Sequence, residues 1–152
     1  MASYLGIEKN ISYLTIPAAL MLGLLPRVYS GLTGPGSKFF DPNSPRTFAA
    51  RLDNAEIDKK LRGRLQRAEA AVANAFETLG LYAAAVTAGN AAGVPADTMN
   101  NLTLGYLASR LLYTWIYIWG QENRKIRPLR THVWGIGMIL LMTMFVKAGS
   151  RI

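Results

Sequence analysis

An acidic residue, Glu77, lies in the middle of a long alanine-rich segment. Asn74 precedes it by three residues and Arg67 by ten, so the three side chains share one face of a helix with about 3.6 residues per turn. In a membrane-spanning helix, charged side chains usually face the bundle interior or a cavity, because exposing them to lipid is costly. The spacing therefore indicates either a polar network that joins helices or one wall of a polar pocket.

A second polar stripe follows further along the chain. It consists of residues at intervals of three or four: Arg110, Tyr113, Tyr117, Gln121 and Arg124. We expect Glu77 and Arg110 to pair, because their charges are opposite and each lies on an otherwise apolar helix; such a pair can be purely structural. A single Glu-Arg pair would not require the two phenols or the additional arginines. Their presence therefore favours a polar pocket. Arginine suits such a pocket, since it binds carboxylates and stabilises a developing anion.

The composition indicates which elements position these side chains. Of the 152 residues, 51% are hydrophobic and only 17% charged, well below the ~25% charged of an average soluble domain. The formal charge is nevertheless +8, a combination that is ordinary for a small integral membrane protein. The chain has no Cys and one His, which excludes disulfides, a catalytic thiol and thiolate metal sites and argues against a Ser-His-Asp triad.

Four segments approach the ~20 residues that a membrane-spanning helix needs. The predicted spans are residues 11–29, 68–93, 98–120 and 131–148, within a single domain over residues 1–152. The second span is the least apolar, but its small residues allow close approach of membrane helices. We therefore predict an all-α, integral membrane four-helix bundle, with a long connection over residues 30–66 that begins with Gly/Pro turn signals and ends in a charged, helix-permissive stretch.

Basic residues are concentrated in alternate connections. Residues 27–66 carry eight Lys and Arg residues and residues 124–130 carry four, whereas residues 89–97 carry none. The positive-inside rule places the first and third connections in the cytosol and both termini on the lumenal side. Trp115, Tyr117 and Trp119 are expected in an aromatic belt near the cytosolic interface. This bias explains the positive charge without a nucleic-acid partner.

Three short motifs occur in order on the second, third and fourth spans. They are RAEAAVANAFE from Arg67 to Glu77, R-x-x-Y-x-x-x-Y from Arg110 to Tyr117, and P-L-R-T at residues 128–131. In this order and in a chain of this size, they resemble the MAPEG family, the membrane-associated proteins in eicosanoid and glutathione metabolism. That family includes microsomal glutathione transferases, leukotriene-C and prostaglandin-E synthases, and the non-enzymatic five-lipoxygenase-activating protein.

The resemblance implies a homotrimer in the endoplasmic reticulum membrane, with glutathione in polar clefts between subunits near the cytosolic side. By matching position, Asn74 and Glu77 would hold the backbone and amino end of the peptide. Arg27 is a further candidate contact, although its more ordinary role is that of an interfacial anchor. The candidate glutathione-binding residues are Arg27, Arg67, Asn74, Glu77, Arg110 and Tyr113.

The resemblance also implies an arginine near the start of the fourth span that holds the thiolate, because a nearby cation favours the charged form of a thiol. Arg124 keeps the seven-residue distance from Tyr117, whereas Arg130 keeps the P-L-R-T context, and Arg127 lies between them. We favour Arg130. The candidate catalytic residues are Arg130, Arg124 and Tyr117.

We therefore expect a membrane-embedded, glutathione-dependent transferase, peroxidase or isomerase that acts on a lipophilic electrophile. Ala70 stands four residues before Asn74, where many enzymatic relatives carry an arginine. A second hypothesis is thus an enzyme of this fold that isomerises or cyclises a hydrophobic metabolite without glutathione. A third is a non-catalytic, lipid-presenting protein, which the charges within the spans disfavour. The sequence has no metal-ligand spacing, P-loop or dinucleotide fingerprint, so we expect no metal site.

Overall fold

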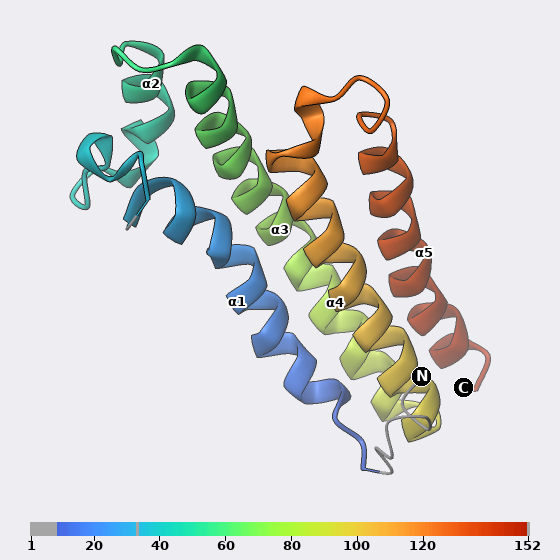
Figure 1. Ribbon diagram of the computed structural model, residues 1–152. Coiled ribbons are helices and arrows are strands. Elements are labelled where there is room, and N and C mark those ends of the chain that lie inside the picture. Colours follow the sequence, from blue (N-terminus) through green and yellow to red (C-terminus); the bar gives the residue numbers. More distant parts are fainter. Residues whose placement is uncertain (1–8, 33, 152) are drawn as a thin grey trace.

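The computed structural model describes residues 9–32 and 34–151, and this part of the chain is all-helical, as predicted (Figure 1). Residues 1–8, 33 and 152 of the predicted domain lie outside the described residues. The α-helices are α1 (Thr15–Arg27), α2 (Phe48–Asp53), α3 (Lys59–Ala91), α4 (Ala96–Ile118) and α5 (Leu129–Gly149). Each of the four long helices overlaps one of the four predicted spans.

The first helical segment is longer than α1 alone. A 3-10 turn at Ser12–Leu14 precedes α1, and a π turn at Val28–Leu32 follows it. The π turn begins two residues after Pro26, which lacks a backbone donor for the helical ladder. Among the described residues, Ser12–Leu32 and α5 are long and apolar enough to cross a bilayer. Only about a quarter of each segment is buried inside the bundle, which is unlike the mostly buried core helix of a soluble protein. Membrane crossing by α3 and α4 stays a prediction.

Helix α3 starts at Lys59, well before the predicted start of the second span. The Asp58 carboxylate caps this end by accepting a hydrogen bond of 2.9 Å from the Leu61 N–H. With 33 residues, α3 is about 50 Å long, whereas the hydrocarbon core is about 30 Å thick. The first turns of α3 therefore extend beyond the predicted membrane region, where α2 packs on them through Phe48, Leu52 and Leu65.

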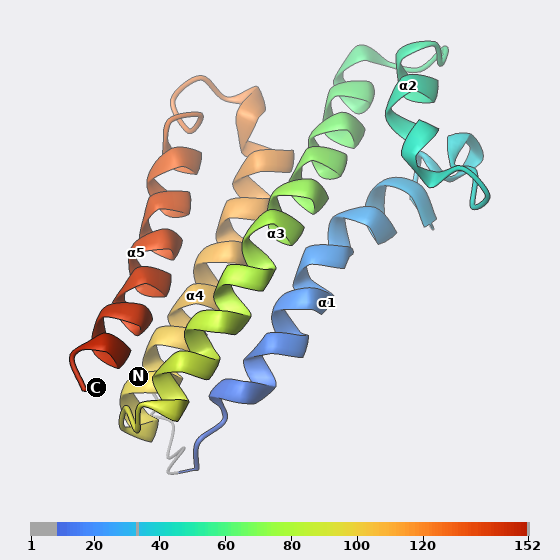
Figure 2. The same cartoon turned by 180° about the vertical axis from the view of Figure 1, so that it is seen from behind.

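The four long helices lie side by side in both views, and the chain reverses between α3 and α4 at Gly93, whose φ of 68° favours glycine (Figures 1 and 2). The α4–α5 connection and α2 lie at the same end of the bundle, and the start of α1 and the end of α5 lie toward the other. Both basic connections are thus at one end, which is the arrangement that the predicted topology requires.

An aromatic pair forms the centre of the bundle core. The rings of Tyr82 on α3 and Tyr106 on α4 stack with centroids 4.1 Å apart, among Met99, Leu141 and Met144. Both phenols have hydrogen-bond partners, as buried hydroxyls require: Tyr82 with Thr15 at 2.6 Å and Tyr106 with Thr78 at 3.2 Å. These bonds fix α1, α3 and α4 against one another below the predicted site.

Candidate functional site

A polar cleft opens between α3, α4 and α5, toward the end that carries the basic connections. Its volume is about 470 Å³, within the range typical of small-molecule sites. The residues that line it are Ala70, Ala73, Asn74, Glu77, Tyr113, Tyr117, Arg130, Thr131 and Trp134. Five of these nine are predicted site residues, and the fold brings them together from three helices.

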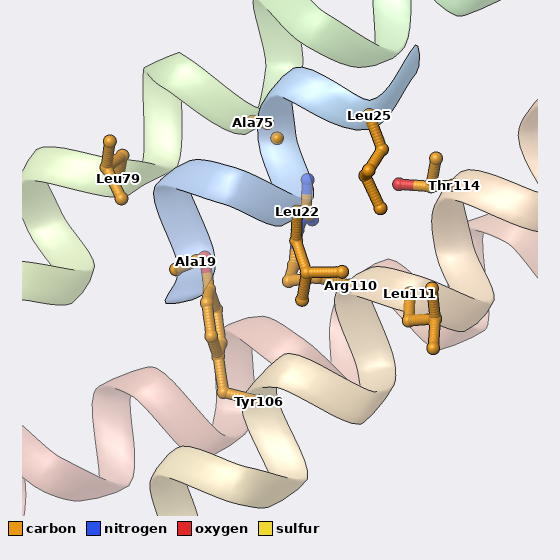
Figure 3. A pocket seen from close by; sticks show the side chains of 10 residues that line it. Ala19, Leu22, Leu25, Ala75, Leu79, Tyr106, Arg110, Leu111 and Thr114 are labelled. Atoms are coloured by element: carbon orange, nitrogen blue, oxygen red, sulfur yellow. The ribbon is translucent and has the colours of Figure 1, made fainter. Parts of the chain in front are cut away.

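Arg110 orients the amide of Asn74. Its Nη2 donates to Asn74 Oδ1 at 2.5 Å, and its guanidinium lies 4.6 Å from the centroid of the Tyr113 ring. Arginine offers only donors, so the amide oxygen must face it, which leaves the Asn74 NH2 group free for the cleft. Arg110 itself is only 7% exposed and lines a small cavity on the other side, between α1, α3 and α4 (Figure 3). It therefore acts on the cleft through Asn74 and Tyr113.

A cation lies directly beside the second phenol. The Arg130 guanidinium is 4.6 Å from the centroid of the Tyr117 ring, and the Tyr117 ring is 5.6 Å from that of Tyr113. Within the described ranges, no carboxylate forms an ion pair with Arg130. Its charge is therefore available to an anion in the cleft.

The predicted pair between Glu77 and Arg110 is not formed, and that prediction was wrong. Glu77 is exposed on the cleft side of α3 and takes part in no ion pair among the described residues. Arg110 is buried and reaches Asn74, one helical turn earlier, because Asn74 faces α4 more directly. Glu77 thus offers its carboxylate to the cleft as a hydrogen-bond acceptor.

Arg67 lies away from the cleft, although it shares a helical face with Asn74. Its Nε and Nη2 donate to the carbonyl oxygen of Ile118 at 3.1 and 2.9 Å, and Nη2 lies 3.5 Å from Glu122. Burial lowers the pKa of Arg67. Arg67 therefore satisfies a carbonyl at the end of α4, a group that has no partner within its own helix.

The predicted stripe on α4 stops at Tyr117. The helix ends at Ile118, so Gln121 lies in a 3-10 turn and Arg124 in the exposed connection, and neither continues the face. Arg124 does not line the cleft, whereas Arg130, in the first turn of α5, does. Arg127 donates to the Gln121 carbonyl at 3.3 Å. Of the three arginines, the fold brings Arg130 to Tyr117.

Arg27 has a structural position at the C-terminal end of α1. Its Nη2 lies 2.8 Å from Glu69, which also accepts a hydrogen bond of 2.9 Å from Ser30. The guanidinium lies 5.6 Å from the Phe40 ring centroid. Arg27 therefore ties α1 to α3 and lies outside the residues that line the cleft.

Four of the nine lining residues were not predicted as site residues: Ala70, Ala73, Thr131 and Trp134. Thr131 and Trp134 follow Arg130 by one and four residues. Because residues four apart share a helical face, the spacing from Arg130 could have predicted Trp134. The sequence does not indicate that Arg110 orients Asn74, because this contact depends on which turn of α3 faces α4.

The cleft combines complementary chemical groups. Asn74 offers amide donors, Glu77 a carboxylate acceptor, Tyr113 and Tyr117 phenols, and Arg130 a cation. These groups can bind a zwitterionic or peptide-like ligand and stabilise an anion next to Tyr117.

Comparison with known proteins identifies the family of the chain. The MAPEG family model matches residues 11–150. No curated protein and no solved structure matched the chain. Since the family model covers nearly the whole sequence, the chain belongs to the MAPEG family, whose members are membrane proteins of eicosanoid and glutathione metabolism.

Proposed function

We propose that this protein is a glutathione-dependent transferase, peroxidase or isomerase of the endoplasmic reticulum membrane that acts on a lipophilic electrophile. One observation carries the proposal: a cleft in which Arg130 stands beside Tyr117, opposite the amide of Asn74 and the carboxylate of Glu77. This set of groups suits a ligand with an ammonium group, several carbonyl or carboxylate oxygens and one acidic thiol.

The residues of the cleft fit glutathione. The Asn74 amide, held in one orientation by Arg110, can donate to a peptide carbonyl or carboxylate, and Glu77 can accept from an ammonium group. A volume of about 470 Å³ is adequate for a tripeptide. Glutathione supplies a sulfur nucleophile when bound.

Arg130 is the residue that activates this nucleophile in our proposal. A guanidinium near a thiol favours the thiolate, so it lowers the pKa of the thiol toward neutral pH. The Tyr117 ring, 4.6 Å from the guanidinium, restricts the positions that Arg130 can take. The Tyr117 hydroxyl is then a candidate donor to the sulfur or to an anion that develops on the second substrate.

A trimer would complete the cleft. Seven residues of α3 at alternating three- and four-residue spacing are exposed: Ala70, Ala73, Glu77, Gly80, Ala84, Thr87 and Ala91. All but Glu77 are small, which permits close contact with a helix of another subunit. Such a contact would also shield the Glu77 carboxylate from lipid, where an exposed charge is costly.

The proposal is tested by glutathione binding to the purified protein, measured by calorimetry together with thiolate absorbance. We expect saturable binding and a thiolate signal that Arg130→Gln abolishes. Arg124→Gln is the matched control, because it removes the same charge from an exposed position outside the cleft. A thiolate signal that is lost in Arg124→Gln and retained in Arg130→Gln would refute the assignment.

The position of Ala70 favours a second candidate function. Ala70 lines the cleft, so the side chain of an arginine at this position would lie at the cleft wall. An enzyme of this fold that isomerises or cyclises a hydrophobic metabolite without a thiol would need no cation there. Turnover of a lipophilic substrate without thiol, together with no glutathione binding in the folded protein, would establish this alternative.

A further inference from the structure

An apolar groove lies between α1 and α4, near the end of the basic connections. Its volume is about 210 Å³. Leu25 on α1 and Leu111 and Trp115 on α4 line it, and each is more than 50% exposed, so the groove opens outward from the bundle. The groove and the polar cleft share none of their described lining residues, so they are separate sites.

The groove continues inward. A smaller cavity of about 40 Å³ shares Leu25, Leu111 and Thr114 with it and reaches Arg110 and Tyr106. Figure 3 shows Leu25 and Thr114 pointing toward each other from facing helices. An apolar path therefore runs from the outer surface between α1 and α4 into the bundle. The shape and the largely apolar lining of this path suit a hydrocarbon chain.

A cluster of cations lies in the first turns of α3. Lys60, Arg64 and Arg67 all contact the Glu122 carboxylate, at 3.0, 2.5 and 3.5 Å. Hydrogen bonds from Arg64 and then Lys60 hold the pKa of Glu122 at about 2. Three cations thus share one carboxylate among the described residues, which leaves a local surplus of positive charge.

This basic cluster adjoins the groove. Arg67 donates to the carbonyl of Ile118, and Ile118 and Trp119 line the groove. Tyr29 also lines it, with its ring centroid 5.2 Å from that of Trp119, and Tyr29 interacts electrostatically with Arg64 and Arg67. The aromatic rings therefore separate an apolar groove from a cationic cluster, the arrangement expected where acyl chains meet headgroups.

We propose that the groove and the basic cluster together bind one anionic phospholipid of the cytosolic leaflet. An acyl chain would occupy the groove between α1 and α4, and the anionic headgroup would lie at Lys60 and Arg64. Two observations carry this assignment independently: the apolar lining that opens outward, and the surplus of cations at its polar end. Basic pockets between helices on the cytosolic side are known to bind anionic headgroups.

The test is lipid binding by the intact purified assembly, measured by native mass spectrometry with phosphatidylserine or phosphatidylcholine of identical acyl chains. We expect preferential retention of phosphatidylserine. Lys60→Gln with Arg64→Gln should reduce this preference about 25-fold, since each basic residue near an anionic surface contributes about fivefold. Arg46→Gln with Lys125→Gln is the matched control, because it removes the same charge outside the cluster. Equal loss in both double variants would overturn the headgroup site.

Glu122→Gln distinguishes binding from a structural role. If the cluster only joins α3 to the α4–α5 connection, this variant should weaken lipid binding or leave it unchanged, and either result would overturn the proposal. If the cluster binds the anionic headgroup, removing the competing carboxylate should tighten phosphatidylserine binding severalfold.

The acyl-chain part is tested separately. Leu25→Trp fills the groove and should reduce retention of both lipids, whereas Met21→Trp, at an exposed position of α1 outside the groove, should not. Glycerophosphoserine, which has the headgroup and no chains, should bind much more weakly than the lipid. Equal affinity for the two, or equal effects of both Trp variants, would refute occupation of the groove.

Discussion

The contact between Arg110 and Asn74 allows a quantitative test of the site geometry. A double-mutant cycle with Arg110→Met and Asn74→Leu should give a coupling free energy of about 1.5 kcal/mol. This value lies at the upper end for hydrogen bonds between membrane helices, because the donor is charged and the distance is only 2.5 Å. A second cycle with Arg110→Met and Glu77→Gln should give less than about 0.5 kcal/mol, since no ion pair joins these residues in the described part of the chain.

Both cycles are measured by equilibrium unfolding in mixed detergent micelles at a fixed protein concentration, with helix content from circular dichroism as the signal. The fixed concentration matters because the proposed trimer would make the apparent stability depend on protein concentration. Single variants would not suffice, since removing one partner also leaves the other without its hydrogen bond. A larger coupling for Glu77 than for Asn74 would refute the geometry and restore the pair that we expected from the sequence.

The remaining predictions concern protonation, packing and assembly. The folded pKa of Glu122, about 2, lies below its ordinary value of 4.5, so its contribution to stability is present above pH 4.5 and is lost as the pH falls through 2. The difference in unfolding free energy between the wild type and Glu122→Gln should shrink over this window, and a constant difference would contradict it. Gly23→Ala should destabilise the protein by about 1–3 kcal/mol, because a Cβ there would lie 2.9 Å from the Ala75 Cβ, whereas Gly135→Ala meets no atom within 4 Å and should not. Gly80→Leu should dissociate the proposed trimer in analytical ultracentrifugation while Gly135→Leu does not, and an intact trimer would exclude the exposed α3 stripe from the interface.

Several features of the fold were predictable from the sequence. Long apolar segments predict helices at nearly the observed positions, because helix length and hydrophobicity are properties of contiguous residues. Helical spacing also placed Tyr113 and Tyr117 on one face, and both line the cleft. The charged stretch before residue 68 was predicted to be helix-permissive, but the start of α3 at Lys59 was not predicted, because it depends on the Asp58 cap and on packing of α2.

Local sequence thus determined the all-helical class, the positions of the long helices and two short polar stripes, since these depend on periodicity within one segment. Only the tertiary structure decided which residues meet. Arg67 and Asn74 share a face of α3, yet Arg67 binds the end of α4 and Asn74 binds Arg110, because the two positions are two turns apart and meet different parts of α4. The choice between Arg124 and Arg130 likewise depended on α4 ending at Ile118, which redirects the chain before it enters α5. Contacts between distant segments follow from helix packing, and no single segment encodes them.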